Sequence, residues 1–594
     1  MTYKYTNYSQ YYYFVIKGYG EKYILRLPIK EELVSALSEE KTSGVGRRGV
    51  LKFAVTAIVA GVVAGVGGYF SGVAAAPPAK TVTETMTETL AAETITVTAP
   101  AKTVTETMTI TLTPTVAWWE KYMPRADRLL PEWVLKMGGY PKGYLAKYDW
   151  ARALPWDDII REMEGKTCNM IVEGVDVGPI EMYEPLFKEL TKSKTVLTAI
   201  PTAVYHEKLM AEMTSPVSKI DVADLFFEWT GAYLPYLIDI SPFIEKYNID
   251  LGSIHPLWRR LMLRGERVIG LVKDADSKLF YSRLNLLEKA GWSKPPTTWE
   301  EVIAACEDLK PIGDKEGWYP IVVQYPAKGW FCHFMFLTMA FQWEDFTCVE
   351  LGTWKPKYAT EGAVKALETV KTLLEYAPPG NIDFGYEEYR TMWLAGKAAM
   401  TAGFQCFGQA WDPKLSKISP VTTDNIIICS PFPKGTTLRI PGNWATTVMG
   451  IPKAARSPEL AFLWSVFIGS QESSMIMGVA RTGTECGHTE MLKNPVVQKM
   501  MPPYKVIWET AHTAWTEPWA FIPEVFEIET AVGTELYKYI SGAVEDPWKV
   551  LKSADEKATE ILEKRGYFKP GAPEPPILSL EEWCRVNKVS LPRP

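Results

Sequence analysis

The sequence has no excess of basic residues. Its 64 Lys and Arg are outnumbered by 70 Asp and Glu, which gives a formal net charge of −6. Proteins that bind nucleic acid neutralise phosphates with clustered Lys and Arg. Nucleic acid is therefore not an expected partner of this chain.

Cysteine is scarce, and short catalytic or metal motifs are missing. All eight Cys lie at or after Cys168, and they form no CxxC pair and no zinc spacing with the five His. The segment "CGH" at 486–488 is too short and isolated to count as a metal site, and no HExxH or GxSxG is present. We predict no metal, no cofactor and no catalytic residue. Disulfides stay open for a part that faces an oxidising exterior, without a deducible pairing.

Aromatic residues are plentiful, with 22 Trp and 29 Tyr among 594 residues. A chain of this length is expected to form one large two-lobed module or several domains. Most aromatics in such a chain belong to the core. A few displayed in a cleft would suit a flat, partly apolar ligand.

Residues 53–76 contain no charged side chain and are long enough to span a bilayer as a helix. The basic residues Lys41, Arg47, Arg48 and Lys52 precede them, which predicts a cytoplasmic N-terminal end. "RRGVLK" resembles a twin-arginine export signal, and the small residues of "AAAPP" fit a cleavage site. No lipid-attachment Cys follows. We expect the signal or anchor segment, residues 47–76, to be retained, because the segment that follows is of use only on a tethered protein.

That following segment, residues 77–117, is written almost twice: "PAKTVTETMTETL" starts at Pro78 and "PAKTVTETMTITL" at Pro100. Thr, Pro and Glu without large apolar residues cannot offset chain entropy by burial, and Thr-rich tracts with Pro are typical of O-glycosylated stalks. We therefore predict a spacer. Residues 1–46, a Tyr-rich cytoplasmic extension, indicate either a small strand pair or an overextended gene start. The role of the tail, residues 570–594, is left undecided.

The composition becomes globular after Trp118. Thr298 with Glu301 fits a capping box, and Asp546, Pro547 and Gly566 fit the cap, first position and stop of a late helix. Short apolar runs between helices predict strands: "CNMIVEG", "TVLTAIP", "RVIGLV", "YPIVVQY" and "NIIICSPFP". This alternation predicts an α/β architecture with mainly parallel sheets covered by helices.

Four ordered stretches of the body resemble a known family. They are 218–247 with "SKIDVADLFFEW", 267–310 with "LLEKAGWSKPPTTWEE", 393–404 with "WLAGKAAMTAGF", and 442–473 with "GNWATTVMGIPKAA". The body is similar to the extracellular solute-binding proteins of ABC importers, the group that includes maltose and other sugar receptors. The resemblance covers roughly 166–568. It departs at "AGFQCFGQAW", where the family often has Gly-Pro-Trp, and at "VEGVDVGPI" after the first strand.

The resemblance implies a two-lobed α/β fold of the type II periplasmic-binding-protein kind, with hinge crossings and a central ligand cleft. Residues 118–165 would be an additional N-terminal segment, and 166–569 the two-lobed domain. Lobe 1 would hold about 166–274 and 445–485, and lobe 2 about 277–442 and 490–569. Segments 274–278 and 443–445 would cross between the lobes.

Family position also gives the candidate ligand contacts, which sit after strands and at crossings. Aromatic rings would cover the apolar face of a sugar-like solute, and carboxylates or amides would orient its hydroxyls. The candidates are Glu173, Asp176, Trp229, Asp276, Trp330, Phe404, Gln405, Trp444, Trp515 and Trp519. Each has a plainer alternative, since a Trp on a loop more often packs in the core and a carboxylate more often caps a helix.

We therefore expect a receptor at the extracellular face of the membrane that binds a small solute, with carbohydrate favoured, and delivers it to importer permease subunits. Peptide, polyamine or metal-chelate solutes remain alternatives. Two other classes also remain open, a cell-surface glycosidase, which needs two carboxylates across a scissile bond, and a structural surface protein.

Overall fold

The computed structural model describes residues 7–8, 11–18, 21–28 and 150–594, apart from 175–176, 182, 325, 406, 408–426, 441–445 and 481–484. The chain divides into two compact units, residues 1–107 and 108–594. The predicted anchor (47–76), the stalk (77–117) and residues 118–149 of the additional segment lie outside the described residues. Within the described ranges, no helix combines the length and apolar character that a membrane crossing needs.

The first unit contains a small antiparallel sheet. Strands β1 (Asn7–Tyr8), β2 (Tyr11–Gly18) and β3 (Glu21–Pro28) lie in the order β1-β2-β3. Tyr11 is paired with Pro28 and Gly18 with Glu21, so β2 and β3 form a complete hairpin. The Tyr-rich segment thus contains a strand pair, and the alternative of an overextended gene start remains open.

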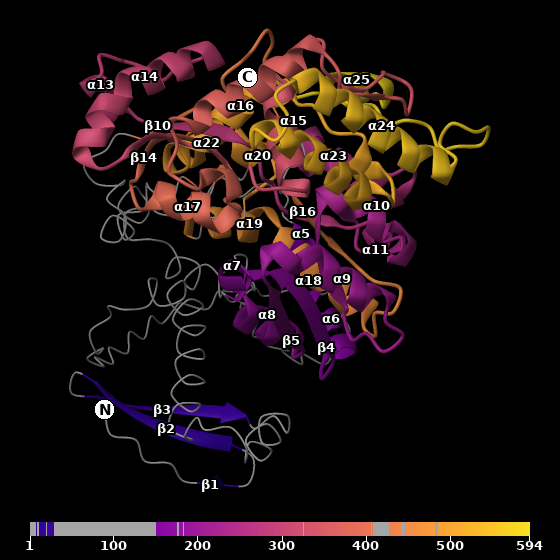
Figure 1. Ribbon diagram of the computed structural model, residues 1–594. Helices are drawn as coiled ribbons and strands as arrows, with labels where there is room; N and C mark the ends of the chain where they lie inside the picture. The colour runs from indigo at the N-terminus through magenta and orange to yellow at the C-terminus, as the bar shows by residue number, and fades with distance from the viewer. Residues whose placement is uncertain are drawn as a thin grey trace, which may run out of the picture. The chain divides into compact units, whose positions relative to one another are not determined.

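One sheet of the second unit has five strands in the order β5-β4-β6-β16-β9. These strands are β4 (Thr167–Glu173), β5 (Lys194–Ile200), β6 (Val222–Phe226), β9 (Leu271–Asp274) and β16 (Thr447–Gly450). Helices α8 (Glu184–Thr191) and α18 (Pro458–Gly469) pack against this sheet, as Figure 1 shows around β4 and β5. We call this group lobe 1.

A second sheet has four strands in the order β11-β14-β10-β15. They are β10 (Leu279–Arg283), β11 (Tyr319–Val322), β14 (Ala398–Gly403) and β15 (Ile427–Ser430). Helices α14 (Trp299–Glu316), α16 (Glu361–Leu374) and α17 (Tyr386–Leu394) lie around β10 and β14 in Figure 1. Helix α15 (Trp330–Ala340) packs against both α16 and α23 (Val525–Ile540). We call this group lobe 2. The finer lobe boundaries of the sequence analysis remain predictions.

The longer helices are α6 (Trp156–Met163), α8 (Glu184–Thr191), α9 (Tyr205–Thr214), α14 (Trp299–Glu316), α15 (Trp330–Ala340), α16 (Glu361–Leu374), α17 (Tyr386–Leu394), α18 (Pro458–Gly469), α19 (Gln471–Ala480), α22 (Pro502–Thr510), α23 (Val525–Ile540) and α24 (Pro547–Arg565). The shorter elements are α5 (Trp150–Ala153), α7 (Val177–Glu181), α10 (Thr230–Tyr233), α11 (Ser241–Lys246), α12 (Pro256–Arg259), α13 (Leu284–Lys289), α20 (Thr489–Leu492), α21 (Pro495–Met500), α25 (Leu580–Val586), β7 (Leu263–Arg264), β8 (Arg267–Val268), β12 (Cys348–Val349) and β13 (Pro356–Lys357).

The prediction of mainly parallel sheets is wrong. Three neighbouring pairs are parallel, β4 with β5, β4 with β6, and β11 with β14. In these same two sheets four pairs are antiparallel, β16 with β6 and β9, and β10 with β14 and β15. Parallel neighbours in one sheet need a crossover segment, usually a helix. Strands that arrive directly from the other sheet have no such constraint, and these are the antiparallel ones.

Two segments join a strand of one sheet directly to a strand of the other. Residues 275–278 join β9 of lobe 1 to β10 of lobe 2, and residues 431–446 join β15 of lobe 2 to β16 of lobe 1. The first is the predicted crossing at 274–278, which the structure confirms. The second contains the predicted stretch 443–445, which lies outside the described residues. The two crossings meet where the Thr446 hydroxyl donates to the Asp276 carbonyl, at 3.2 Å.

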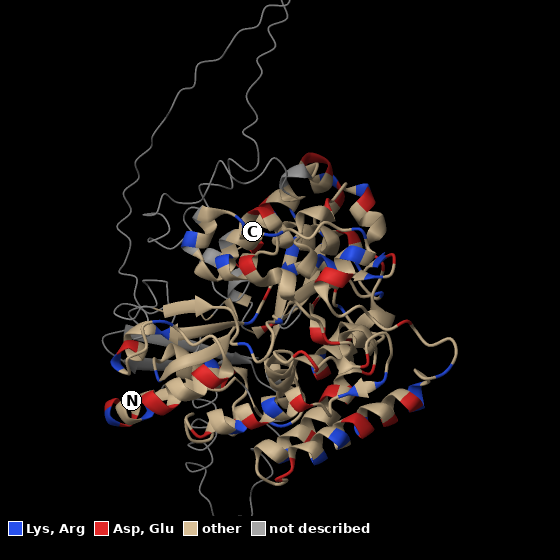
Figure 2. Cartoon of the chain, turned by 90° about the horizontal axis from the view of Figure 1, so that it is seen from above, with Lys and Arg blue, Asp and Glu red and all other residues tan. Residues whose placement is uncertain are grey.

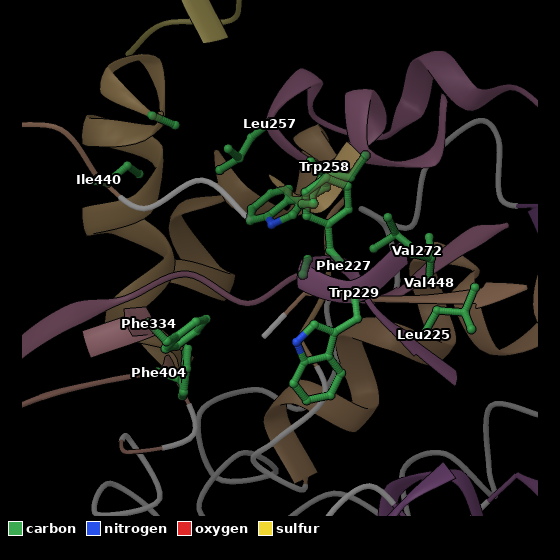
Figure 3. Packing of buried hydrophobic residues seen from close by; sticks show 14 of the residues in the cluster. Leu225, Phe227, Trp229, Leu257, Trp258, Val272, Phe334, Phe404, Ile440 and Val448 are labelled. Carbon is green, nitrogen blue, oxygen red and sulfur yellow. The ribbon is translucent and has the colours of Figure 1, made fainter. Parts of the chain in front are cut away.

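Each sheet is covered by a large apolar core. Figure 3 shows Leu225, Val272 and Val448 of the five-stranded sheet together, and Phe334 beside Phe404 in lobe 2. The seven cysteines that the structure describes are free thiols, six of them buried. Within those residues, packing and not disulfide bonding holds the lobes.

Candidate functional site

Contacts between lobe 1 and lobe 2, here called the interlobe seam, gather near the ends of β4, β6 and β14. Trp229 follows β6 and is buried at 3% exposure. Its indole Nε1 donates to Glu529 Oε2 of α23 at 2.9 Å. Its ring meets Trp330, the first residue of α15, edge to face with centroids 4.9 Å apart. The structure thus brings two predicted aromatic contacts together across the seam.

A second aromatic contact lies beside the first. His206 of α9 stacks on Phe526 of α23, with ring centroids 4.2 Å apart and planes 13° apart. Its Nδ1 lies 2.9 Å from the Tyr233 hydroxyl. Burial lowers the pKa of His206 to about 4, so the ring is neutral at pH 7.

Glu173 ends β4 and is buried. The Thr202 hydroxyl lies in contact with this carboxylate and also 3.1 Å from Glu387 Oε1 of α17. Because Glu387 belongs to lobe 2, this group of three polar residues joins the lobes at the carboxyl end of β4. Carboxylates in such a place can accept hydrogen bonds from solute hydroxyls.

Gln405 follows β14, and its side chain is fully buried. Its Nε2 donates to the Ala275 carbonyl at 2.9 Å, while its Oε1 accepts from the Ser277 amide at 2.8 Å. Both ends of the amide are therefore bonded to the first crossing. This predicted ligand contact has a positioning role at the hinge, and a solute contact stays a prediction.

Lys278 ends the same crossing and is fully buried. Its ammonium lies 3.8 Å from the Phe334 ring centroid and 5.3 Å from that of Phe404, and it donates to the Thr338 hydroxyl at 3.0 Å. Burial lowers the pKa of Lys278 well below its usual value, and Glu228 and Asp276 act in the opposite direction. Phe404, a predicted solute contact, therefore packs beside the buried Lys278 ammonium.

Asp276 is buried and lies in the first crossing. Its carbonyl accepts from Trp258 Nε1 at 3.1 Å as well as from Thr446. Its carboxylate lies close to those of Asp274 and Glu485. The prediction placed Asp276 at a crossing, and the structure confirms that position.

Trp515 and Trp519 have contacts of different kinds. The guanidinium of Arg439 lies 4.1 Å from the Trp515 ring centroid, and Trp515 is partly exposed. Trp519 is fully buried and donates from Nε1 to the Tyr358 hydroxyl at 2.7 Å. Trp519 therefore packs inside lobe 2. The other two candidates, Asp176 and Trp444, lie outside the described residues.

Three buried acids near the seam escaped the sequence analysis: Glu228, Glu517 and Glu529. Burial, with Glu228 as a further cause, raises the pKa of Glu517 to about 8. Burial first and then Glu517 raise the pKa of Glu529 well above its ordinary value. Glu228 directly precedes Trp229, and Glu517 lies in "TEPW" two residues before Trp519, so each adjoined a predicted aromatic. Nothing in the sequence marked them as buried.

Comparison with known proteins identifies the body. Residues 180–475 match the model of the bacterial extracellular solute-binding protein family. The body belongs to this family. Its members are the substrate-binding proteins of ABC transporters, which bind small solutes outside the cytoplasm and deliver them to permeases, and they are not enzymes. Membership therefore replaces both the glycosidase and the structural-protein alternatives.

A curated relative and two solved structures support this assignment. A probable amino-acid ABC transporter periplasmic-binding protein of Sinorhizobium fredii is 24% identical over 377 residues, 61% of this chain and 81% of the relative. Maltose-bound MalE3 of T. maritima superposes with a TM-score of 0.61 at 18% identity, covering 67% of this chain and all of that one. A solute-binding protein of Agrobacterium vitis with bound D-mannitol gives a TM-score of 0.58 at 18% identity, covering 68% and 99%. The structural matches establish the two-lobed fold.

Proposed function

We propose that the protein captures a carbohydrate or polyol at the interlobe seam and holds it for an importer. The observation that carries this proposal is the meeting of Trp229 and Trp330 from opposite lobes beside buried carboxylates. Aromatic faces match the apolar C–H faces of a sugar, and carboxylates match its hydroxyl edges. The maltose and mannitol bound to the two structural neighbours support the same solute class.

The seam also supplies a physical reason for solute-driven closure. Trp229 comes from lobe 1, whereas Trp330 and Glu529 come from lobe 2. Similarly, Glu173 and Thr202 come from lobe 1 and Glu387 from lobe 2. A solute that touches both sets gains its full contacts only when the lobes are together. Binding then shifts the population toward the closed form that the permease recognises.

The relative from Sinorhizobium fredii gives the second candidate, because its name assigns it amino acids. An amino acid carries an ammonium group, which pairs with carboxylates and needs no aromatic face. The carboxylates Glu173, Glu228 and Glu387 would serve such a solute as well as a sugar. The two candidates differ in what the tryptophans contribute.

A thermal-unfolding screen of the purified full chain separates them. Maltose, longer glucans, mannitol and a set of amino acids are titrated separately. The true solute raises the free energy of unfolding by about 2.7 kcal/mol at 100 times its dissociation constant. We expect a sugar or polyol to do so. Stabilisation by amino acids alone would remove the carbohydrate assignment.

Trp229→Phe tests the site within the same assay. It keeps a ring against Trp330 but removes the donor to Glu529, so we expect roughly tenfold weaker binding, or about 1–1.5 kcal/mol. Trp548→Phe, on α24, is the matched control and should leave the affinity unchanged. Equal affinity in both variants would place the solute elsewhere.

We further propose that residues 53–76 anchor this receptor at the outer face of the membrane and that 77–117 hold it away as a glycosylated stalk. An extended chain spans at most about 3.5 Å per residue, so the stalk reaches beyond roughly 100 Å. Sedimentation of the intact protein with membranes after alkaline washing is the expected result. Recovery of a soluble protein whose N-terminus begins after Ala76 would show cleavage.

A further inference from the structure

A histidine and two glutamates meet in the interior beside the seam. One atom from each of His333 (α15), Glu517 and Glu529 (α23) lies within 4.8 Å of one atom from each of the others. The exposed fractions of the three side chains are 0%, 0% and 1%. We call these residues the His333 cluster. It contains no predicted solute contact, although Trp229 touches it.

Nδ1 of His333 points into the cluster, and Nε2 is hydrogen-bonded on the opposite side of the ring. Its Nε2 lies 2.8 Å from the Tyr358 hydroxyl, which itself accepts from Trp519 Nε1 at 2.7 Å. Among the residues that the structure describes, its Nδ1 has no hydrogen-bond partner, and it lies 4.0 Å from Glu517 Oε2. The ring orientation is therefore fixed from behind, with Nδ1 directed at a carboxylate beyond hydrogen-bond reach.

The carboxyl groups are also short of donors. The two carboxyl groups share a side-chain hydrogen bond with each other. Within the described residues, neither oxygen of Glu517 accepts from any other N–H or O–H group, and the same is true of Glu529 Oε1. Glu529 Oε2 accepts from Trp229 Nε1. A proton shared between the two carboxyls would satisfy them partly, but it would leave Nδ1 of His333 without a partner.

We propose that His333, Glu517 and Glu529 form a buried site for one divalent transition-metal ion, with Zn²⁺ the best match. An imidazole nitrogen with two carboxylate oxygens is a donor set that Zn²⁺ accepts in four-coordinate sites, whereas Mg²⁺ and Ca²⁺ prefer oxygen alone. Since the three atoms lie within 4.8 Å of one another, some point lies within about 2.8 Å of all three. Small rotations of the two glutamates bring that distance to the roughly 2.0–2.2 Å of zinc bonds.

The proposed ligands are also hydrogen-bonded from behind, as metal ligands usually are. Tyr358 behind His333 and Trp229 behind Glu529 supply the outer hydrogen bonds that orient metal ligands. A metal ion binds carboxylates in their deprotonated form, so binding is expected to release protons. Because Trp229 belongs to lobe 1, a filled site also fixes one side of the seam.

Zinc titration of the full chain by calorimetry tests the site. The protein is first treated with chelator, and any affinity tag is removed. We expect one Zn²⁺ per chain, proton release measured as a difference between buffers of unlike ionisation enthalpy, and weak or no response to Mg²⁺ and Ca²⁺.

Variants decide whether the ion sits in the cluster. Glu517→Gln has the shape of the neutral carboxyl, so the fold should persist, and the one-to-one binding should vanish. Trp229→Phe should weaken zinc binding by about 10–100-fold, as loss of an outer partner does. Glu535→Gln, elsewhere on α23 and bonded to Lys538, is the control that should bind normally.

Unchanged zinc binding in Glu517→Gln, or no stoichiometric binding in the parent protein, would overturn the proposal. Circular dichroism of Glu517→Gln separates loss of the ligand from loss of the fold, and His333→Gln provides a second removal of a ligand. Solute binding is scored separately by the unfolding screen, so failure of the metal site leaves the proposed solute unaffected.

Discussion

Lys273 and Asp224 form an ion pair with no exposed surface. Lys273 Nζ lies 2.8 Å from Asp224 Oδ2, and the two residues stand on β9 and β6 with β16 between them. Taking two charges out of water is costly, so such a pair contributes little net stability while both partners are present. The effect of the pair on stability appears when one partner is removed and the other stays buried.

We expect Asp224→Ala to lower the free energy of unfolding by about 3–5 kcal/mol, because the lysine is left buried without its counter-charge. Urea denaturation measures the change. Glu368→Gln, which breaks the exposed pair with Lys365, is the control and should cost less than about 1 kcal/mol. Equal losses in the two variants would contradict the role of burial.

A candidate residue could be predicted from the sequence where its position next to a strand or a crossing indicates which residues surround it. Trp229 was predicted because it follows a recognisable strand, and Asp276 because it sits in a recognisable crossing. Glu529 is the fifth residue of α23 and has no motif around it, and only tertiary packing brings it to Trp229. Gln405 shows that the right position does not guarantee the predicted role. It follows β14 as expected, but its side-chain amide is bonded to the backbone of the first crossing.

Helix ends follow their sequence signals closely. Thr298 caps α14 by accepting from the Glu301 amide at 3.2 Å, as predicted. The Glu301 carboxylate bonds to the amide and hydroxyl of Thr297, one residue before the expected partner. Asp546 caps α24, and Gly566 ends it with φ of +87°, which a residue with a side chain rarely adopts.

Thr298→Ala is expected to cost about 1 kcal/mol, because one amide at the start of α14 loses its acceptor. The midpoint of urea denaturation reports it. Thr298→Ser keeps the oxygen and should recover most of the loss. If Ser and Ala were equivalent, the cap would have no energetic role.

Strand positions were equally accessible to prediction, and strand direction was not. Runs such as "CNMIVEG" and "TVLTAIP" became β4 and β5, since apolar runs bounded by breakers identify buried strands. Direction depends on which sheet a strand enters. β16 and β10 arrive across the crossings, and nothing within four or five residues encodes that route.

At the scale of the whole molecule, charge is spread and histidine is buried. Figure 2 shows Lys and Arg interspersed with Asp and Glu along the helices. Burial lowers the pKa of all five histidines, and the value falls to about 4, 3, 3 and 4 for His206, His255, His333 and His488. Burial raises the pKa of Glu517 to about 8, and that of Glu529 also rises.

These shifts predict a stability maximum between about pH 6 and 7, measured as thermal unfolding in chelator. As pH falls below about 6.5, histidines become protonated in the unfolded chain but stay neutral in the folded protein. Stability therefore falls with falling pH. As pH rises from about 4.5 toward 8, unfolded glutamates lose protons that the buried pair keeps, so stability also falls. On the acid side the five histidines outweigh the two glutamates, and above pH 7 the two glutamates dominate.

The double variant Glu517→Gln with Glu529→Gln should lose the alkaline decline and keep the acid one. Stability of the parent protein that rises steadily to pH 9 would contradict the assignment of raised pKa values to this pair.

The meeting of the two crossings at Asp276 and Thr446 has a geometric consequence. When the halves turn relative to one another, atoms near the pivot travel least, and atoms farthest along the lever travel most. Thr202 follows β5 and Glu387 lies in the first turn of α17, so this pair joins the two lobes outside the crossing segments. A pair of fluorescent or spin labels at positions 202 and 387 should therefore report a change in distance when the lobes rotate. The same labels at 276 and 446 should report almost none.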